Sequence, residues 1–255
     1  MSLSIQTNIA AMDAHRNLVT TSNQLSQSME RLSSGYRINS AADDAAGLAI
    51  STKLDSQVSG LQQAQQNAQD AVSLVQTADG SMNEVQSMLQ RVRDLAVEYN
   101  NGTLSSSDQA AITNEVAQLC AEVSQIGSQT KFNGIALLSG GNSITFQVGA
   151  DDGETISVSA LKLFGSGSGF SIDSAIDSVS TARSTFGAVQ NRLQHTLNNL
   201  ASYQENLSAS ESGIKDVDMA SEMVNFTKLQ VLQQAGTAML AQANSSQQSV
   251  LRLLQ

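Results

Sequence analysis

Apolar side chains recur along most of this chain at steps of three and four residues, which is typical of amphipathic helices. The longest such stretch runs from about residue 48 to 99 and predicts a rod of about 80 Å at ~1.5 Å per residue. Further helices are expected at about 107–128 and from about Ser174 to 210. We therefore predict a mainly α fold, in which long antiparallel helices form a coiled-coil-like bundle.

The two ends of the chain each carry a narrow apolar stripe that cannot form a core alone. Gly35 is expected to cap the first helix, and Gly213 to separate the last helix, starting near Asp216, from the one before it. We predict that the terminal helices pair with each other and with copies of the chain. The packing residues of this terminal domain are predicted to be Ile5, Ile9, Met12, Leu18, Leu25, Met29, Leu32, Met223, Phe226, Leu229, Leu232, Met239 and Leu254.

The segment from about 131 to 170 differs from the helical parts. Residues 143–148 and 155–158 alternate apolar and polar side chains, and Asp151-Asp152-Gly153 between them predicts a β-hairpin. Two domains are expected. One combines 1–44 with 211–255, and the other, at 45–210, contains three helical segments and the hairpin region.

Composition supports long helices with thin cores. The chain of 255 residues contains no Pro, which would break helix interiors, and only 4% aromatic residues. Its net charge of −10 disfavours nucleic-acid binding. Residues 1–44 and 211–255 each carry four acidic and three basic side chains, so the ends are nearly neutral and can pack against copies. The single cysteine, Cys120, lies in the apolar phase of a helix and is predicted to be buried.

Signals for catalysis, cofactors and membranes are missing from the sequence. The two histidines, His15 and His195, lie far apart, and no HExxH, CxxC, P-loop or GxSxG motif occurs. We therefore predict no catalytic residues, cofactor or metal. The sequence contains no run of 18 apolar residues, so we predict no membrane insertion. Its first residues lack the basic and apolar regions of a cleaved signal peptide.

Several stretches closely resemble the signatures of bacterial flagellins. Near the N-terminus these are residues 29–39 (MERLSSGYRIN) and 42–50 (ADDAAGLAI), followed by 67–70, 74–78 and 89–97. Residues 131–134 resemble the turn after the third core helix of that family. Residues 216–223 (DVDMASEM) and 242–244 match its C-terminal signature. The resemblance extends over the whole chain except for about 140–172.

This resemblance implies a subunit of the flagellar filament, exported unfolded through the flagellar type III apparatus and located outside the cell without signal cleavage. It implies a helical homopolymer, with the export apparatus, an export chaperone and the filament cap as further partners. The terminal helices would form the inner core of the filament, and the uncharged stretch 229–251 would line its channel. The domain at 45–210 would form the surrounding layer.

The resemblance also suggests recognition by an animal Toll-like receptor through Arg91, Leu95 and Glu115. The alternative is that Arg91 and Glu115 are polar residues of the packing layer that take part in contacts between subunits. Two alternatives to a filament subunit remain at this stage. One is a flagellin-like protein at the hook–filament junction, and the other is a secreted monomeric coiled-coil binding protein.

Overall fold

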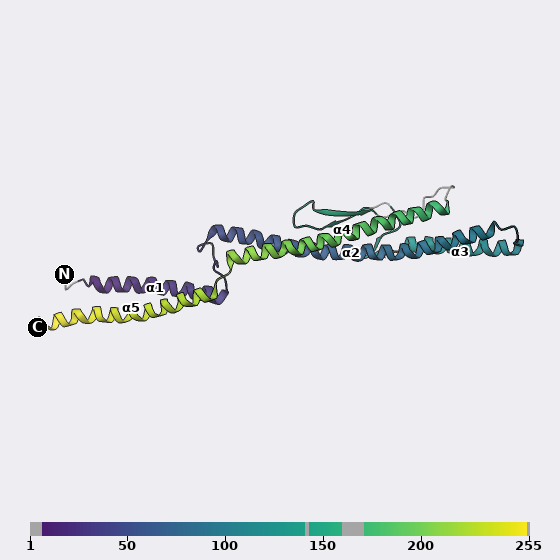
Figure 1. Ribbon diagram of the computed structural model, residues 1–255. Helices are drawn as coiled ribbons and strands as arrows, with labels where there is room; N and C mark the ends of the chain where they lie inside the picture. Colours follow the sequence, from purple (N-terminus) through teal and green to yellow (C-terminus); the bar gives the residue numbers. More distant parts are fainter. Residues whose placement is uncertain (1–6, 141–142, 160–170, 254–255) are drawn as a thin grey trace. The chain divides into compact units, whose positions relative to one another are not determined.

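The computed structural model describes residues 7–140, 143–159 and 171–253 of the chain (Figure 1). Helices account for most of these residues, so the predicted mainly α fold is confirmed. The elements in chain order are α1 (Ile9–Ser34), α2 (Ala45–Tyr99), α3 (Ser106–Gln129), β1 (Lys131–Phe132), β2 (Ile135–Ala136), β3 (Ser143–Gln147), β4 (Thr155–Ser159), α4 (Ile172–Lys215) and α5 (Met219–Leu253).

Side-chain caps explain where several helices begin. The amide oxygen of Asn8 accepts a 3.0 Å hydrogen bond from the N–H of Ala11 at the start of α1. The Asp44 carboxylate accepts a hydrogen bond from the N–H of Gly47 at 2.9 Å, at the start of α2. At α3 the Ser105 hydroxyl and N–H donate to Asp108 in a capping box, and these hydrogen bonds lower the pKa of the Asp108 carboxyl.

The segment that follows α1, near residue 36, is hydrogen-bonded to the segment that joins α4 to α5, near residue 216. Gly35 adopts the left-handed conformation (φ 78°) that ends α1, as predicted. The N–H of Arg37 donates to the carbonyl of Lys215 at 2.7 Å, and that of Val217 donates to Gly35 at 3.0 Å. The Lys215 ammonium also lies 4.7 Å from the centre of the Tyr36 ring.

The predicted break at Gly213 is wrong. α4 continues through this residue to Lys215, and α5 begins only at Met219. A glycine inside a helix disfavours it by only about 1 kcal/mol relative to alanine, which is too little to end a helix that packs along its length. The break coincides instead with the paired connections described above.

Both strand pairs are antiparallel hairpins. In β3–β4 the register runs from Ser143 opposite Ser159 to Gln147 opposite Thr155, which confirms the predicted hairpin. The second pair, β1–β2, turns at Asn133-Gly134, where both residues have positive φ. An Asn-Gly dipeptide suits such a turn because both residues tolerate this conformation.

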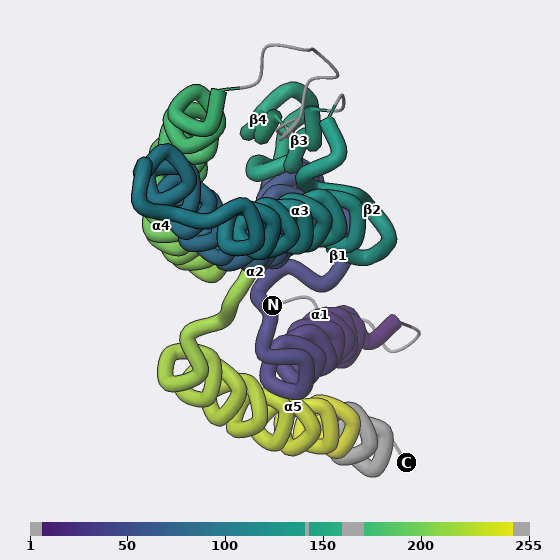
Figure 2. The backbone as a smooth tube through the Cα atoms, turned by 90° about the vertical axis from the view of Figure 1, so that its right-hand side faces the viewer, coloured from purple at the N-terminus to yellow at the C-terminus, as the bar shows by residue number. Residues whose placement is uncertain are grey.

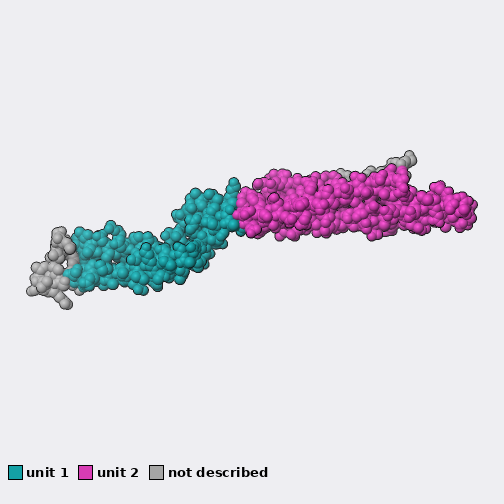
Figure 3. Space-filling view, viewed as in Figure 1, with its two compact units in different colours: residues 1–55, 208–255 teal, residues 56–207 magenta. Residues whose placement is uncertain are grey.

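The chain divides into two compact units, coloured separately in Figure 3. Unit 1 comprises residues 1–55 and 208–255, and unit 2 comprises 56–207. The prediction placed the corresponding boundaries at 44/45 and 210/211. The assignment of the two parts to inner and outer filament layers remains a prediction.

Unit 2 contains a continuous apolar core. It lies between α2, α3 and α4 and includes the inward face of the β3–β4 hairpin, with Ile156 and Val158 buried. α2 contributes small and medium side chains such as Ala71, Val75 and Val85, each 0% exposed. Phe186 of α4 is the only aromatic side chain among the fully buried members of this cluster in the described residues. Thin helix-to-helix seams were expected from the low aromatic content.

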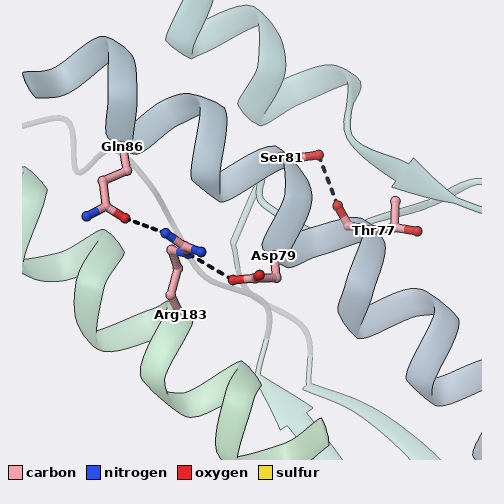
Figure 4. A network of polar contacts seen from close by, with 5 residues as sticks. All are labelled: Thr77, Asp79, Ser81, Gln86 and Arg183. Atoms are coloured by element: carbon pink, nitrogen blue, oxygen red, sulfur yellow. Dashed lines mark hydrogen bonds and ion pairs between the residues drawn. The ribbon is translucent and has the colours of Figure 1, made fainter. Parts of the chain in front are cut away.

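A polar clamp joins α2 and α4 at the edge of this core (Figure 4). The Nε of Arg183 donates to Oδ1 of Asp79 at 2.9 Å, and its Nη1 donates to the side-chain oxygen of Gln86 at 2.7 Å. The side chains of Arg183 and Asp79 are 31% and 39% exposed, respectively. The planar guanidinium can satisfy both acceptors at once, which fixes the local register of the two helices.

Cys120 is exposed on α3, so the prediction that it is buried is wrong. α3 covers the core with only one narrow face, on which Ile112, Val123 and Gly127 are buried. Leu119 at the margin of that face is half-buried, and the next residue has already turned toward solvent. The apolar phase in the sequence was wider than the face that is actually covered.

Candidate self-assembly surface

α1 and α5 pack side by side as an antiparallel pair within unit 1 (Figure 2). Their contact faces follow steps of three and four residues, the spacing of a coiled-coil seam. On α1 this spacing is kept by the half-buried or buried residues Ala11, Ala14, Leu18, Thr21, Leu25, Ser28 and Leu32, and Ser22 and Arg31 beside them are also half-buried. On α5 they are Glu222, Phe226, Leu229, Gln233, Gly236, Leu240 and Ala243.

Three contacts fix the register of this pair. Asn8 Nδ2 donates to the carbonyl of Ala243 at 3.1 Å. A Cβ added at Gly236 would lie 3.2 Å from Cδ1 of Leu18, so the glycine allows the helices to approach closely there. At the other end the Ser28 hydroxyl, which is 2% exposed, donates to the Glu222 carboxylate.

The seam between α1 and α5 buries little apolar surface. Among the described side chains of these two helices, only Ser28 and Leu229 are buried, at 2% and 5% exposed. Helices of this length gain most of their stability from packing an apolar face, because intrinsic propensity contributes little. The pair therefore has much less internal stabilisation than the core of unit 2.

Large apolar side chains also remain exposed on both helices, outside the seam. We call this set the outer face. Its members are each between 45% and 72% exposed: Ile9, Met12, Val19 and Met29 on α1, and Met219, Met223, Val224, Val231, Leu232 and Met239 on α5. Exposed apolar side chains in such number are typical of surfaces that contact other proteins.

A shallow groove runs along the outer face of α5. It is lined by Met223, Val224, Thr227, Lys228, Val231 and Leu232. Lys228 is the only charged side chain in this lining, and no other charged residue follows it in the sequence until Arg252. The groove can therefore accept an apolar partner surface with little desolvation of charge.

The predicted packing residues separate into two groups. Leu18, Leu25, Leu32, Phe226 and Leu229 lie in the seam between α1 and α5. The outer face carries Ile9, Met12, Met29, Met223, Leu232 and Met239. Ile5 and Leu254 fall outside the described residues. The role of either group in contacts between subunits remains a prediction.

Sequence reasoning missed the small and polar members of the seam. Ser28, Glu222 and Gly236 were not among the predicted packing residues, because only large apolar side chains were counted. Had alanine, serine and glycine been included, the regular steps of three and four on α1 would have distinguished the seam from the outer face.

The three positions considered for receptor recognition lie in unit 2. Arg91 of α2 and Glu115 of α3 form a salt bridge at 2.9 Å, with both side chains about half exposed. Leu95 is 1% exposed and belongs to the interior of the unit. A partner approaching this surface would therefore meet the Arg91–Glu115 pair, whereas the Leu95 side chain lies beneath it.

The described residues contain neither a metal site nor a membrane-spanning helix. No group of His, Cys, Asp and Glu side chains within 7–140, 143–159 and 171–253 is arranged to bind a metal ion. No helix in the same ranges is both long and apolar enough to span a membrane.

Comparison with known proteins supports the family resemblance. Residues 5–143 match the bacterial flagellin N-terminal helical region, and residues 171–254 match the bacterial flagellin C-terminal helical region. The flagellin of Halalkalibacterium halodurans is 47% identical over 98% of this chain and 99% of its own length. The 33 kDa flagellar filament core protein of Treponema phagedenis is 41% identical with the same coverage.

A solved structure supports the fold. The crystal structure of Bacillus cereus flagellin is 32% identical in sequence, with a TM-score of 0.50, and covers 57% of this chain and 94% of that protein. The alternatives of a junction protein or a monomeric binding protein are not favoured by these matches. The chain belongs to the bacterial flagellin family and is a structural subunit of the flagellar filament, not an enzyme.

Proposed function

We propose that this flagellin polymerises by burying the outer face of unit 1 against neighbouring copies, and that α1 and α5 become stably ordered only in the filament. This proposal rests on the contrast between buried and exposed side chains within unit 1. The seam fully buries very few side chains, while ten large apolar residues on the same two helices remain exposed. Ordering the pair without covering the outer face leaves the conformational entropy of the chain largely uncompensated.

The charge distribution supports close packing of copies. The terminal segments are each nearly neutral, so neighbouring subunits can approach without strong repulsion. The excess of acidic residues lies in the middle of the chain. We propose on this basis that unit 1 belongs to the inner part of the filament and unit 2 to the layer around it, with the uncharged stretch 229–251 facing the channel.

Hydrogen exchange tests the coupling of folding to assembly. Amides of residues 1–35 and 218–255 should exchange freely in the monomer and become protected in the filament, whereas α2 and α4 of unit 2 should be protected in both. Full protection of the terminal segments in the monomer would refute the proposal.

Substitution in the groove of α5 tests the surface itself. Val224 is 72% exposed, so Val224→Asp should leave the melting temperature of the monomer unchanged. Polymerisation should be lost, because the filament would have to bury a carboxylate, alone or together with Lys228 one turn away, in an apolar contact. The matched Val224→Ile variant keeps an apolar side chain at the same place and should polymerise normally. Equal polymerisation of the two variants would contradict the assignment of this face.

The export apparatus, an export chaperone and the filament cap remain proposed partners. The exposed groove on α5 supports the chaperone in particular, since an apolar surface of this size needs covering before assembly. If so, Val224→Asp should also weaken the binding of a purified export chaperone to the monomer, measured by calorimetry.

A receptor on animal cells is a second proposed partner. The exposed Arg91–Glu115 pair supports it, because charged pairs at a surface can steer and orient a binding partner. Monomeric protein should activate cells that carry the receptor, and Arg91→Ala should reduce this activation. Absence of activation by the unmodified protein, or equal activation by both, would exclude this role.

A further inference from the structure

The methionines of this protein are distributed unevenly between its two units. Five of them, Met12, Met29, Met219, Met223 and Met239, lie on the outer face of unit 1 and are 48–64% exposed. Within the described part of unit 2, Met82 is 0% exposed, and Met88 is half-buried against the apolar core. The accessible thioethers are thus concentrated on the proposed assembly surface.

A methionine thioether reacts with peroxides and hypochlorite when they can reach its sulfur. The oxidant transfers one oxygen atom to the sulfur, and the thioether is oxidised by two electrons to a sulfoxide. A peroxide is reduced to water or an alcohol in this step, and hypochlorite is reduced to chloride. The product is polar and accepts hydrogen bonds, unlike the apolar side chain it replaces. Reductases specific for each sulfoxide epimer reverse the reaction.

We propose that the methionines of the outer face are an oxidation site that controls assembly. Hydrogen peroxide or hypochlorite converts them to sulfoxides in the free subunit and blocks polymerisation, whereas the filament protects them. The proposal rests on the function proposed above, because protection requires the outer face to be buried between copies.

The position of these residues explains why their oxidation acts on assembly and spares the fold. None of the five is buried in the unpolymerised chain, so a sulfoxide there keeps its hydration. Polymerisation would transfer it into an apolar contact without a specific partner. Leaving even one such group unpaired should raise the critical concentration at least about tenfold, equivalent to about 1.4 kcal/mol.

The test uses the full chain with Cys120→Ser, because the exposed thiol of Cys120 would also react with peroxide. Monomer and filament are treated with hydrogen peroxide, and mass spectrometry measures sulfoxide at each methionine. Polymerisation of the treated monomer is then followed by sedimentation, before and after incubation with sulfoxide reductases of both epimer classes. A variant in which all five residues are changed to Leu serves as the matched control, since this exchange conserves volume.

In the monomer the five positions should oxidise at least several-fold faster than Met82, and in the filament they should be protected. The oxidised monomer should fail to polymerise, and reductase treatment should restore polymerisation. The Leu variant should polymerise equally well before and after peroxide treatment. If the five positions are protected in the filament but oxidised monomer polymerises normally, this inference fails and the assembly surface stands. If they react equally in monomer and filament, the proposed burial of the outer face fails as well. If the Leu variant does not fold, the recovery of polymerisation after reductase treatment and the oxidation measured at each methionine still test the proposal.

Discussion

The same substitution at two leucines should distinguish the stability of the subunit from the stability of the filament. Leu193 of α4 is 0% exposed in the core of unit 2, and Leu229 of α5 is 5% exposed in the seam of unit 1. Leucine and alanine are both strong helix formers, so Leu→Ala mainly removes packing at either site. Such truncations in a packed interior destabilise by about 2–5 kcal/mol.

The two variants should differ in where this loss appears. Leu193→Ala should lower the unfolding free energy of the monomer by about 3 kcal/mol, and thus its melting temperature by about 6–12 °C for a unit of this size. Leu229→Ala should leave the melting of the monomer unchanged, because α1 and α5 contribute little before assembly. With half-buried neighbours around it, we expect a loss of about 2–3 kcal/mol in the filament, which raises the critical concentration roughly 30- to 150-fold.

Calorimetry of the monomer and sedimentation of the polymer at several protein concentrations measure both quantities. The decisive result is the calorimetric one. If Leu229→Ala lowers the melting temperature of the monomer as much as Leu193→Ala does, the terminal helices are already folded before assembly. The coupling of folding to polymerisation would then be wrong, whatever the effect on the filament.

Three further predictions concern the subunit alone. Gly80→Ala should stabilise the monomer by about 0.5–1 kcal/mol in thermal melts, since no atom lies within 4 Å of an added Cβ, whereas Gly60→Ala should gain less because another Cβ lies 3.1 Å away. Arg183→Met should destabilise the monomer by about 1–2 kcal/mol in urea titrations, since both acceptors of the α2–α4 clamp lose their donor, and Arg183→Lys should not restore full stability. The capping hydrogen bonds lower the pKa of Asp108. Their contribution to stability should therefore be complete above pH 3.8, the ordinary pKa, and should be lost as the pH falls through the lowered pKa. Circular dichroism during acid titration should show that Asp108→Asn destabilises the protein less at low pH than near neutrality.

The sequence predicted the long helices well, because their apolar periodicity extends over many turns and no proline interrupts it. It also predicted the β3–β4 hairpin, where alternation and an Asp-Gly turn agree. It failed at Gly213, where the cost of one glycine is too small to end a helix. It also failed at Cys120, where the outcome depends on how wide a helix face is actually covered. That width is a property of the neighbouring elements and cannot be obtained from the periodicity of one segment.

The candidate surface was predicted only as a single set of residues. The large apolar side chains predicted on α1 were listed as one set of packing residues, although Leu18 and Leu25 lie in the seam and Met12 lies on the outer face. A helix with two apolar faces has a blurred periodicity, so the two could not be separated from hydrophobicity alone. The buried Ser28 has no hydrophobic signal, and its hydrogen bond to Glu222 depends on a residue 194 positions away.

The pairing of α1 with α5 also implies a delay during synthesis between the two helices. Asn8 meets Ala243 across a separation of 235 residues, so at a synthesis rate of about 5–20 residues per second the first helix emerges about 10–50 s before its mate. During that interval α1 has no seam to occupy. If α1 and α5 form the assembly surface as proposed, a chain that ends before α5 lacks half of that surface and should not join the filament.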